Sequence, residues 1–204
     1  MSDNSVPEDV FEESWCRLPL VDREALPKGA REVFDTHADP AGWSHAGLRG
    51  PGGVRLHSPR LAQRWHAMGR YLRDETGLGA RVREVAILIT AREHDSRFEW
   101  QQHEKVAQRV GVPLETIEAI KFRRSVDGLD ATDSIVIGLG RQVFGERAVE
   151  PDLFASALAL FGPQQLIDLI SIMGTYAATA AMLTLVDMQL PPGEEPLLPV
   201  EPDS

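Results

Sequence analysis

Apolar residues recur three and four residues apart along most of the chain, which is the periodicity of amphipathic α-helices. Proline, glycine and capping residues divide this pattern into segments, because these residues favour helix ends. We predict helices over residues 22–37, 58–77, 81–94, 96–111 and 163–189, with shorter ones beginning at Pro113, Asp130 and Pro151. No segment shows the alternation of a half-buried strand. The sequence therefore predicts an all-α protein.

The two ends of the chain differ in composition from its middle. Residues 1–20 are rich in Ser, Asp, Glu and Pro, and residues 191–204 are rich in Pro and Glu. Such segments bury little apolar surface, so we expect both to lie outside the core. The sequence predicts an N-terminal extension over 1–20, a single helical domain over 21–190 and a flexible C-terminal tail over 191–204.

Residues 38–56 form the longest stretch without helical periodicity. They are rich in glycine and proline, with Trp43 and His45 among them. Long loops in small domains are uncommon unless they cover a binding site. We therefore predict a long Gly/Pro-rich loop between the N-terminal helix and the core, which acts as a lid over a pocket.

The chain of 204 residues has a formal net charge of -10. This field repels nucleic-acid backbones and anionic membranes, so we expect neither as a partner. Four arginines in and just after the predicted loop fall close enough together to form a local positive spot able to steer a small anion: Arg49, Arg55, Arg60 and Arg64.

Cys16 is the single cysteine, so an intramolecular disulfide, a cysteine metal cage and a CxxC redox pair are all excluded. The acidic start of the chain lacks the charged-then-apolar order of a signal peptide. We expect no apolar run of membrane-spanning length. We expect a cytoplasmic protein.

Two ionisable residues interrupt the apolar side of the helix predicted over 96–111. A helical wheel puts Glu99 and His103 in one arc with its apolar residues, which are Trp100, Val106, Ala107 and Val110. The opposite arc carries its polar residues, which are Arg97, Gln101, Glu104, Lys105, Gln108 and Arg109; Phe98 is the one exception. The arc with Glu99 and His103 is therefore predicted to face the core.

The preceding helix shows the same irregularity at Glu84, which shares a side with Ile87, Leu88 and Ala91. A buried carboxylate needs a hydrogen-bonded partner or takes up a proton. A facing His103 would supply that partner. The pattern predicts a carboxylate–imidazole–carboxylate cluster between paired helices, able to move protons near neutral pH.

Two other interpretations of this cluster stay open. Glu99 and His103, four residues apart, are also compatible with a surface pair or with a purely structural polar network. One His and two carboxylates also suit a metal, with His94 and Asp95 enlarging the set, but helical di-iron sites use duplicated Glu-x-x-His and no second copy occurs here. We predict no metal and no cofactor.

The strings around these residues resemble the carboxymuconolactone decarboxylase family. The similarity rests on Arg83-Glu84-Val85-Ala86-Ile87-Leu88, Phe98-Glu99-Trp100-Gln101-Gln102-His103, Gly111-Val112-Pro113, Leu48-Arg49-Gly50-Pro51, Leu56-His57-Ser58-Pro59 and Arg17-Leu18-Pro19-Leu20. The resemblance implies the alkylhydroperoxidase-D-like helical bundle and a homo-oligomer, a trimer or hexamer.

The peroxidases with this fold use a Cys-x-x-Cys pair between an upstream Glu and a downstream His. Aligned on Glu84 and His103, those cysteines become Ser96 and Glu99, which cannot cycle through a disulfide. A hydroperoxide-reducing antioxidant would therefore have to use Cys16, which lies outside the matching segment. The cysteine-less branch favours a lyase, and a non-catalytic oligomeric protein that binds small molecules is the remaining alternative.

The resemblance implies a cofactor-free decarboxylase of a small carboxylated lactone or related organic acid, as in the breakdown of aromatic compounds. His103 would deliver or accept the proton, Glu99 would orient it or act as partner base, and Glu84 would fix its tautomer. The substrate-binding candidates are Ser96, Trp100, Arg49, Arg55, His57 and Tyr176. Of these, Arg49 or Arg55 would pair with a substrate carboxylate.

Overall fold

The computed structural model describes residues 7–41 and 46–199, and it confirms the all-α class because these residues contain helices and no strand. The helices are α1 (Lys28–Ala38), α2 (Pro51–Arg55), α3 (Pro59–Asp74), α4 (Ala80–Glu93), α5 (Arg97–Arg109), α6 (Leu114–Lys121), α7 (Ala131–Gly140) and α8 (Pro151–Leu185). Short 3₁₀ turns at Arg23–Ala25 and Gly47–Arg49, and a π-helical stretch at Arg141–Glu146, complete the helical elements.

The chain forms two compact units, whose boundaries differ from the divisions predicted at residues 20 and 190. The first contains the described residues up to Tyr71 together with Met182–Glu194, and the second contains Leu72–Ala181 and the described residues from Glu195 onward. Helices α3 and α8 each begin in one unit and end in the other. The units are described separately below.

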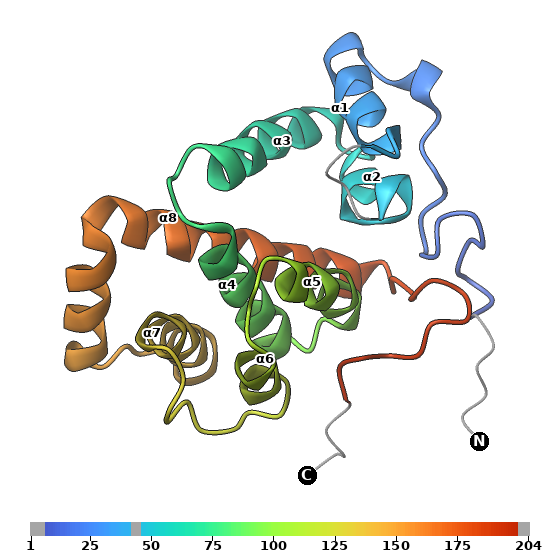
Figure 1. The fold of residues 1–204 in the computed structure, drawn as a ribbon. Coiled ribbons are helices and arrows are strands. Elements are labelled where there is room, and N and C mark those ends of the chain that lie inside the picture. The colour runs from blue at the N-terminus through green and yellow to red at the C-terminus, as the bar shows by residue number, and fades with distance from the viewer. Residues whose placement is uncertain (1–6, 42–45, 200–204) are drawn as a thin grey trace. The chain divides into compact units, whose positions relative to one another are not determined.

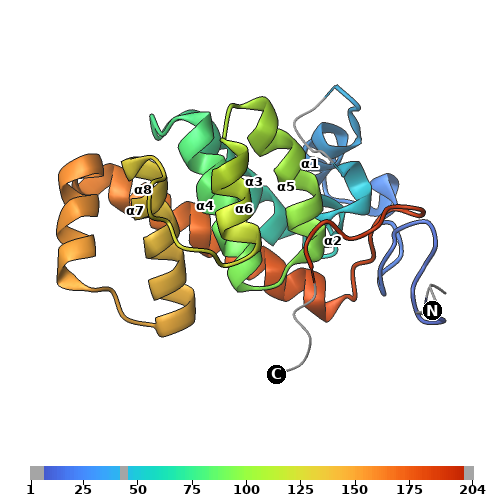
Figure 2. The ribbon, with the colours of Figure 1, turned by 60° about the horizontal axis from the view of Figure 1, so that its bottom comes forward.

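The second unit is built around α4. Figures 1 and 2 show this helix between α7 and α5, and α6 packs against it as well. Every residue from Glu84 to Arg92 is buried, as expected for a helix that has neighbours on all sides. The second half of α8 completes the core with Leu169, Ile172 and Met173.

Sequence signals at the helix ends of this unit act as predicted. Asp130 accepts hydrogen bonds from the backbone N–H groups of Thr132 and Asp133 at the start of α7. Gly111 ends α5 with a φ of 85°, and the N–H of Val112 donates to Ala107 O at 2.9 Å. This is the left-handed cap for which glycine is favoured.

Helix α8 is two helices joined at a corner, as the sequence predicts. Gly162 has φ 67° and ψ 172°, and Pro163 follows it. Figure 1 shows this corner in orange at the left of the ribbon. Proline cannot continue the preceding helix but suits the first turn of the next one, so the direction changes here.

Within the described part of the chain, α8 is also the one helix long and apolar enough to cross a membrane. The expectation that no apolar segment has this length is therefore wrong by length and composition. However, 44% of its most apolar stretch is buried within the protein. Core helices of soluble proteins pass the same test.

The first unit differs from the prediction around α1. The predicted helix over 22–37 is a 3₁₀ turn followed by α1, because Pro27 lacks an N–H and stands at the start of the second helix. Asp22 accepts a hydrogen bond from the N–H of Glu24 at 3.0 Å, so it caps the 3₁₀ turn and not α1.

The stretch 38–56 is not the structureless loop that its glycines suggest. It contains the 3₁₀ turn and α2, with Pro51 in the first helical turn. A Cβ at Gly53 would collide with the carbonyl of Leu48, and one at Gly52 would collide with the His37 ring. These glycines permit close packing of neighbouring groups against the backbone. Glycine is equally common in loops, so the sequence alone does not distinguish the two uses. Trp43 and His45 lie outside the described residues.

Both ends contribute buried side chains, contrary to expectation. Leu198 is 1% exposed within the core of the second unit, where the Leu197 N–H donates to Gln101 Oε1 at 3.1 Å. Ser14 and Cys16 are buried in the first unit. In both end segments, a few buried side chains and hydrogen bonds hold a stretch of mostly polar composition against its unit.

Two glycines inside helices have opposite surroundings and give a paired prediction. A Cβ at Gly140 would lie 2.6 Å from Ile89 Cγ1, whereas one at Gly69 would meet nothing within 4 Å. We expect Gly140→Ala to destabilise the protein by about 1–3 kcal/mol through overpacking, and Gly69→Ala to stabilise it by up to about 1 kcal/mol. Urea unfolding measures both, and equal effects would contradict the packing described.

Candidate functional site

The helical hairpin of α4 and α5 brings Glu84 and His103 together within the second unit. The turn between the helices uses Asp95 in the left-handed region, with a φ of 48°, and the Ser96 N–H donates to Ala91 O at 2.8 Å. A short aspartate tolerates this conformation better than most residues. The return of the chain places the second turn of α5 beside the first turns of α4.

Glu84 and His103 form a hydrogen bond between the two helices. His103 Nδ1 lies 2.8 Å from Glu84 Oε2. The Glu84 side chain is 7% exposed and that of His103 is 13% exposed. An ionised carboxylate only accepts, so in the neutral imidazole this contact places the ring proton on Nδ1 and makes Nε2 the acceptor. The pair that the sequence predicts is therefore present in the structure.

Tyr176 and Glu99, which the sequence also singles out, belong to the same unit as this pair. The Tyr176 ring meets the His103 ring edge to face, with centroids 5.1 Å apart and planes at 86°. Glu99, one turn before His103 on α5, is 3% exposed. Two carboxylates and an imidazole thus occupy buried or nearly buried positions along the α4–α5 hairpin.

Trp100 and Ser96 are less suited to bind a substrate. Trp100 is fully buried, and its Nε1–H donates to Glu104 Oε2 at 2.6 Å. The indole therefore has its one donor engaged within the protein. Ser96 precedes α5 as its N-cap residue but makes no side-chain capping hydrogen bond.

Sequence periodicity missed a second buried polar network on α5. Glu104 and Gln101 are buried, although both belong to the arc predicted to face solvent. Glu104 accepts from Trp100 and also from Lys121 Nζ at 3.0 Å. Gln101 Oε1 accepts a hydrogen bond from the Leu197 N–H at 3.1 Å. Because these partners come from distant segments, only the Trp100–Glu104 spacing of four residues was visible in the sequence.

The structure places the predicted basic and histidine candidates Arg49, Arg55 and His57 in the first unit. The Arg49 Nε–H donates to Glu13 O at 3.0 Å, and the Arg55 guanidinium lies 4.5 Å from the centre of the Trp65 ring. His57 Nε2 lies 3.0 Å from Pro19 O. Each of these three side chains thus contacts another residue of the first unit.

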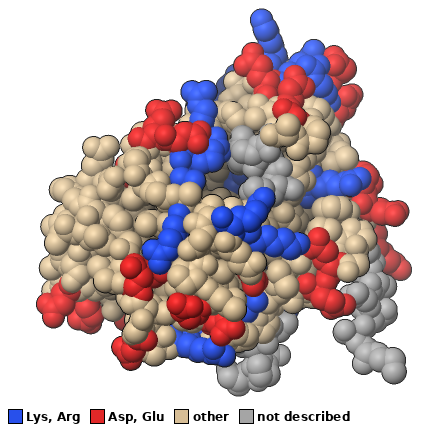
Figure 3. Space-filling view, viewed as in Figure 1, with Lys and Arg blue, Asp and Glu red and all other residues tan. Residues whose placement is uncertain are grey.

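Charge on the face shown in Figure 3 is mixed, with lysine and arginine interspersed among aspartate and glutamate. The left part of this face has few charged side chains. A broad basic surface of the kind that binds nucleic acid is not seen on this face.

His37 is a buried histidine of the first unit that the sequence did not single out. Burial lowers its pKa from 6.5 to about 4, with smaller contributions from His66 and Arg55. The unfolded chain therefore binds a proton at this residue between pH 6.5 and 4 while the folded chain does not. The stability associated with the neutral ring is complete above pH 6.5 and is lost as the pH falls toward 4.

This difference predicts an acid-sensitive first unit. Between pH 7 and pH 4 we expect His37 to account for a loss of about 3 kcal/mol in unfolding free energy. Urea titrations of the wild type and of His37→Gln at both pH values isolate this term from the titration of carboxylates. An identical pH dependence in the two proteins would show that His37 is not responsible.

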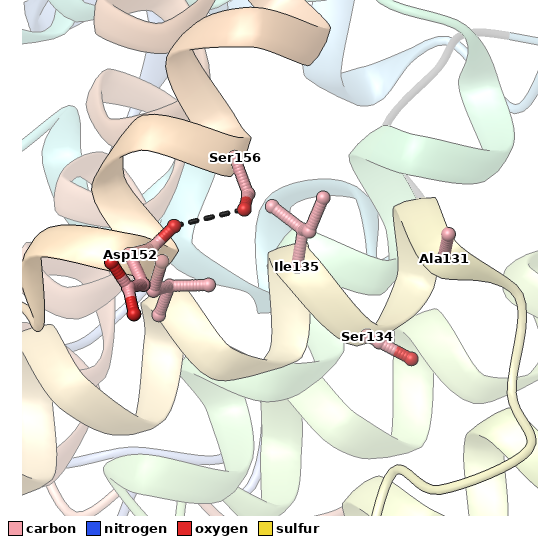
Figure 4. Close-up of a pocket in the computed structure, with 6 residues that line it drawn as sticks. Ala131, Ser134, Ile135, Asp152 and Ser156 are labelled. Atoms are coloured by element: carbon pink, nitrogen blue, oxygen red, sulfur yellow. Dashed lines mark hydrogen bonds between the residues drawn. The ribbon is translucent and has the colours of Figure 1, made fainter.

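A hollow of about 370 Å³ lies between α7 and the first half of α8, lined by Ala131, Ser134, Ile135, Asp152, Leu153 and Ser156. Figure 4 shows the Ser156 hydroxyl donating to the Asp152 carbonyl at 2.8 Å. The Ser134 hydroxyl donates to the Asp130 carbonyl at 3.1 Å. The serine hydroxyls that line this hollow thus donate to backbone carbonyls. Neither Glu84 nor His103 lines the hollow.

Metal binding has no support from the side chains of residues 7–41 and 46–199. Within them, no three His, Cys, Asp or Glu side chains gather so as to hold a metal ion. The α4–α5 hairpin accordingly offers the Glu84–His103 pair as its clearest chemical feature.

The fold and the site define the class only as an all-α protein with a buried Glu–His pair between two paired helices. No protein-family model matches the chain, and no curated protein sequence matches it. The likeness to carboxymuconolactone decarboxylases and the bundle type that it implies therefore stay predictions.

Proposed function

We propose that this protein is a cofactor-free acid–base enzyme, a lyase of the decarboxylase type that acts on a small carboxylated lactone or related organic acid. The observation that carries the proposal is the 2.8 Å hydrogen bond between His103 Nδ1 and Glu84 Oε2. A nearly buried imidazole that keeps some exposure can exchange a proton with a bound molecule.

In this reaction the bond between the substrate carboxylate and its ring carbon breaks, and carbon dioxide leaves. The electron pair of that bond stays on the ring as a dienolate. His103, as the imidazolium, donates its Nε2 proton to the dienolate carbon and returns to the neutral ring. Glu84 holds the imidazole in the Nδ1–H tautomer and stabilises the cation before transfer.

Glu99 has the supporting role in this scheme. It lies one turn from His103 on the same helix and is as buried as Glu84. In the proposed scheme its carboxylate orients His103 or acts as its partner base. The pairing of a substrate carboxylate with Arg49 or Arg55 stays a prediction, because both arginines belong to the other unit.

The two alternative functions have less support. A peroxide-reducing protein needs an accessible thiol, but Cys16 is 1% exposed within the first unit. A non-catalytic binding protein is supported by the Trp100–Glu104–Lys121 network, which shows that this hairpin also buries polar groups without any need for chemistry. A cytoplasmic location and a trimeric or hexameric assembly are further expectations of the proposal.

The proposal is tested with a panel of small carboxylated lactones and cyclic carboxylic acids. Release of carbon dioxide is followed for the wild type and for Glu99→Gln, with Glu115→Gln on the exposed side of α6 as the matched control. We expect turnover in the wild type and the control and its loss in Glu99→Gln. Severe destabilisation by Glu84→Ala with no turnover of any acid would instead support a structural network.

A further inference from the structure

The second half of α8 has an apolar side that the core does not cover. Its inward side carries Leu166, Leu169, Met173, Ala180 and Leu183, all buried. The outward side, here called the α8 stripe, consists of Ile167, Ser171, Gly174, Ala178, Ala181 and Leu185. These residues are four, three, four, three and four positions apart, so they lie in one narrow arc of the helix.

The α8 stripe is accessible along its length. Leu185 and Ile167, at 76% and 62%, are the two most exposed large apolar side chains in the described part of the chain. Gly174, Ala178 and Ala181 between them are also exposed, and a Cβ at Gly174 would meet nothing within 4 Å. The Ser171 hydroxyl donates to Ile167 O at 2.7 Å within the helix. The stripe thus presents an uncharged surface with its hydroxyl already bonded.

The alternating spacing of three and four is that of a helix seam that packs against another helix. Small residues at the centre allow the two helix axes to approach to about 8 Å. The stripe spans about 27 Å, which is eighteen residues at the helical rise.

The order of large and small residues in the stripe is symmetric about Tyr176. Ile167 and Leu185 lie nine residues to either side, Ser171 and Ala181 five, and Gly174 and Ala178 two. An antiparallel copy of the same helix would therefore set large side chains against large ones and small against small. Such self-complementarity is what a two-fold symmetric contact requires.

We propose that the α8 stripe binds the α8 stripe of a second copy of this chain, in an antiparallel pair about a two-fold axis near Tyr176. Charge also favours a second copy. The chain carries a net charge of -10, whereas the charged residues of α8 are only Asp152 and Asp168, and Asp168 is buried. Two copies can meet here without bringing like charges together.

The pair has a consequence for assembly and for the site. A two-fold contact is compatible with a hexamer of three such pairs and not with an isolated trimer. Tyr176, at the centre of the stripe in sequence, contacts the His103 ring from the inward side of the same helix. The pair would thus hold in place the helix that carries Tyr176. The inference itself does not depend on the proposed function.

Sedimentation velocity of the purified chain tests the contact, at concentrations up to on the order of 100 μM because a single helix pair is a small interface. The variant is Ala178→Glu, which puts a charge at the centre of the stripe. Its matched control is Ala159→Glu, at another exposed alanine of α8. We expect the control to sediment as a species of the wild-type mass. Ala178→Glu should sediment as a species of half that mass. A monomeric wild type, or an Ala178→Glu variant of unchanged mass, would overturn the proposal.

Circular dichroism shows whether Ala178→Glu keeps its helicity, and cross-linking provides a second test that does not weaken the contact. Gly174→Cys and Ala178→Cys proteins are mixed under mild oxidation, with the wild type as control for Cys16. In the antiparallel pair, Gly174 of one copy faces Ala178 of the other, while identical positions are offset by about 6 Å along the axis. We expect the mixed disulfide to form faster than either self-pair. Faster self-pairs would show a parallel arrangement and contradict the proposal.

Discussion

Replacing His103 with alanine is expected to lower kcat for the proposed decarboxylation by about 10²- to 10⁴-fold, the range that general acid–base groups supply. The imidazole is the group placed to give a proton to the dienolate, since Glu84 engages its Nδ1 and Nε2 is the nitrogen that takes up a proton and then donates it as the imidazolium. KM should change less than kcat, because the residue acts on the reacting atoms more than on binding.

Glu84→Gln separates the effect of the side chain's shape and position from the effect of its negative charge. Glutamine keeps the shape of the side chain but cannot stabilise an imidazolium as a carboxylate does, and its amide can donate to Nδ1 and so favour the wrong tautomer. We expect a loss in kcat of the same order as for His103→Ala. Gln108→Ala, on the exposed side of α5, is the control and should retain full activity. Turnover that survives in both site variants would exclude the catalytic assignment.

Removing the Glu104 carboxylate is expected to cause the largest loss of stability, about 3–5 kcal/mol for Glu104→Ala. The substitution leaves Lys121 without its ion-pair partner and the buried Trp100 N–H without its acceptor. For a chain of this size, the melting temperature should fall by about 10 °C.

The controls for this prediction separate the lost pair from the lost volume. Glu104→Gln keeps an acceptor for Trp100 and should cost less than Glu104→Ala. Glu115→Ala, on the exposed side of α6, should stay within about 0.5 kcal/mol of the wild type. Guanidinium unfolding of the three variants gives the free energies. A loss below about 1 kcal/mol for Glu104→Ala would mean that water replaces the pair at no cost.

Helix ends were predictable from the sequence because the residues that set them act locally. Asp130 caps α7 with its own side chain, Gly111 ends α5 in the left-handed region, and Gly162 with Pro163 turns α8. Glu84 and His103 were predictable for a related reason. Each stands on the apolar side of an amphipathic pattern, and a short hairpin joins the two helices.

Features set by remote segments could not be predicted in the same way. Burial of Glu104 depends on Lys121 from α6, and burial of Gln101 depends on residues 195–197. Gly52 and Gly53 have the composition of a flexible loop, yet they allow His37 and Leu48 to approach α2 closely. Periodicity within one helix contains no information on such partners.

The central claim is that Glu84 holds His103 as a proton-transfer group within the α4–α5 hairpin. The most direct measurement is nitrogen-15 NMR of the His103 ring, at a pH where the ring is neutral, in the wild type and in Glu84→Gln. The structure predicts a protonated Nδ1 and an Nε2 without a proton in the wild type, with a change of tautomer population in the variant. A wild-type ring protonated on Nε2, or spectra that do not differ between the two proteins, would contradict it.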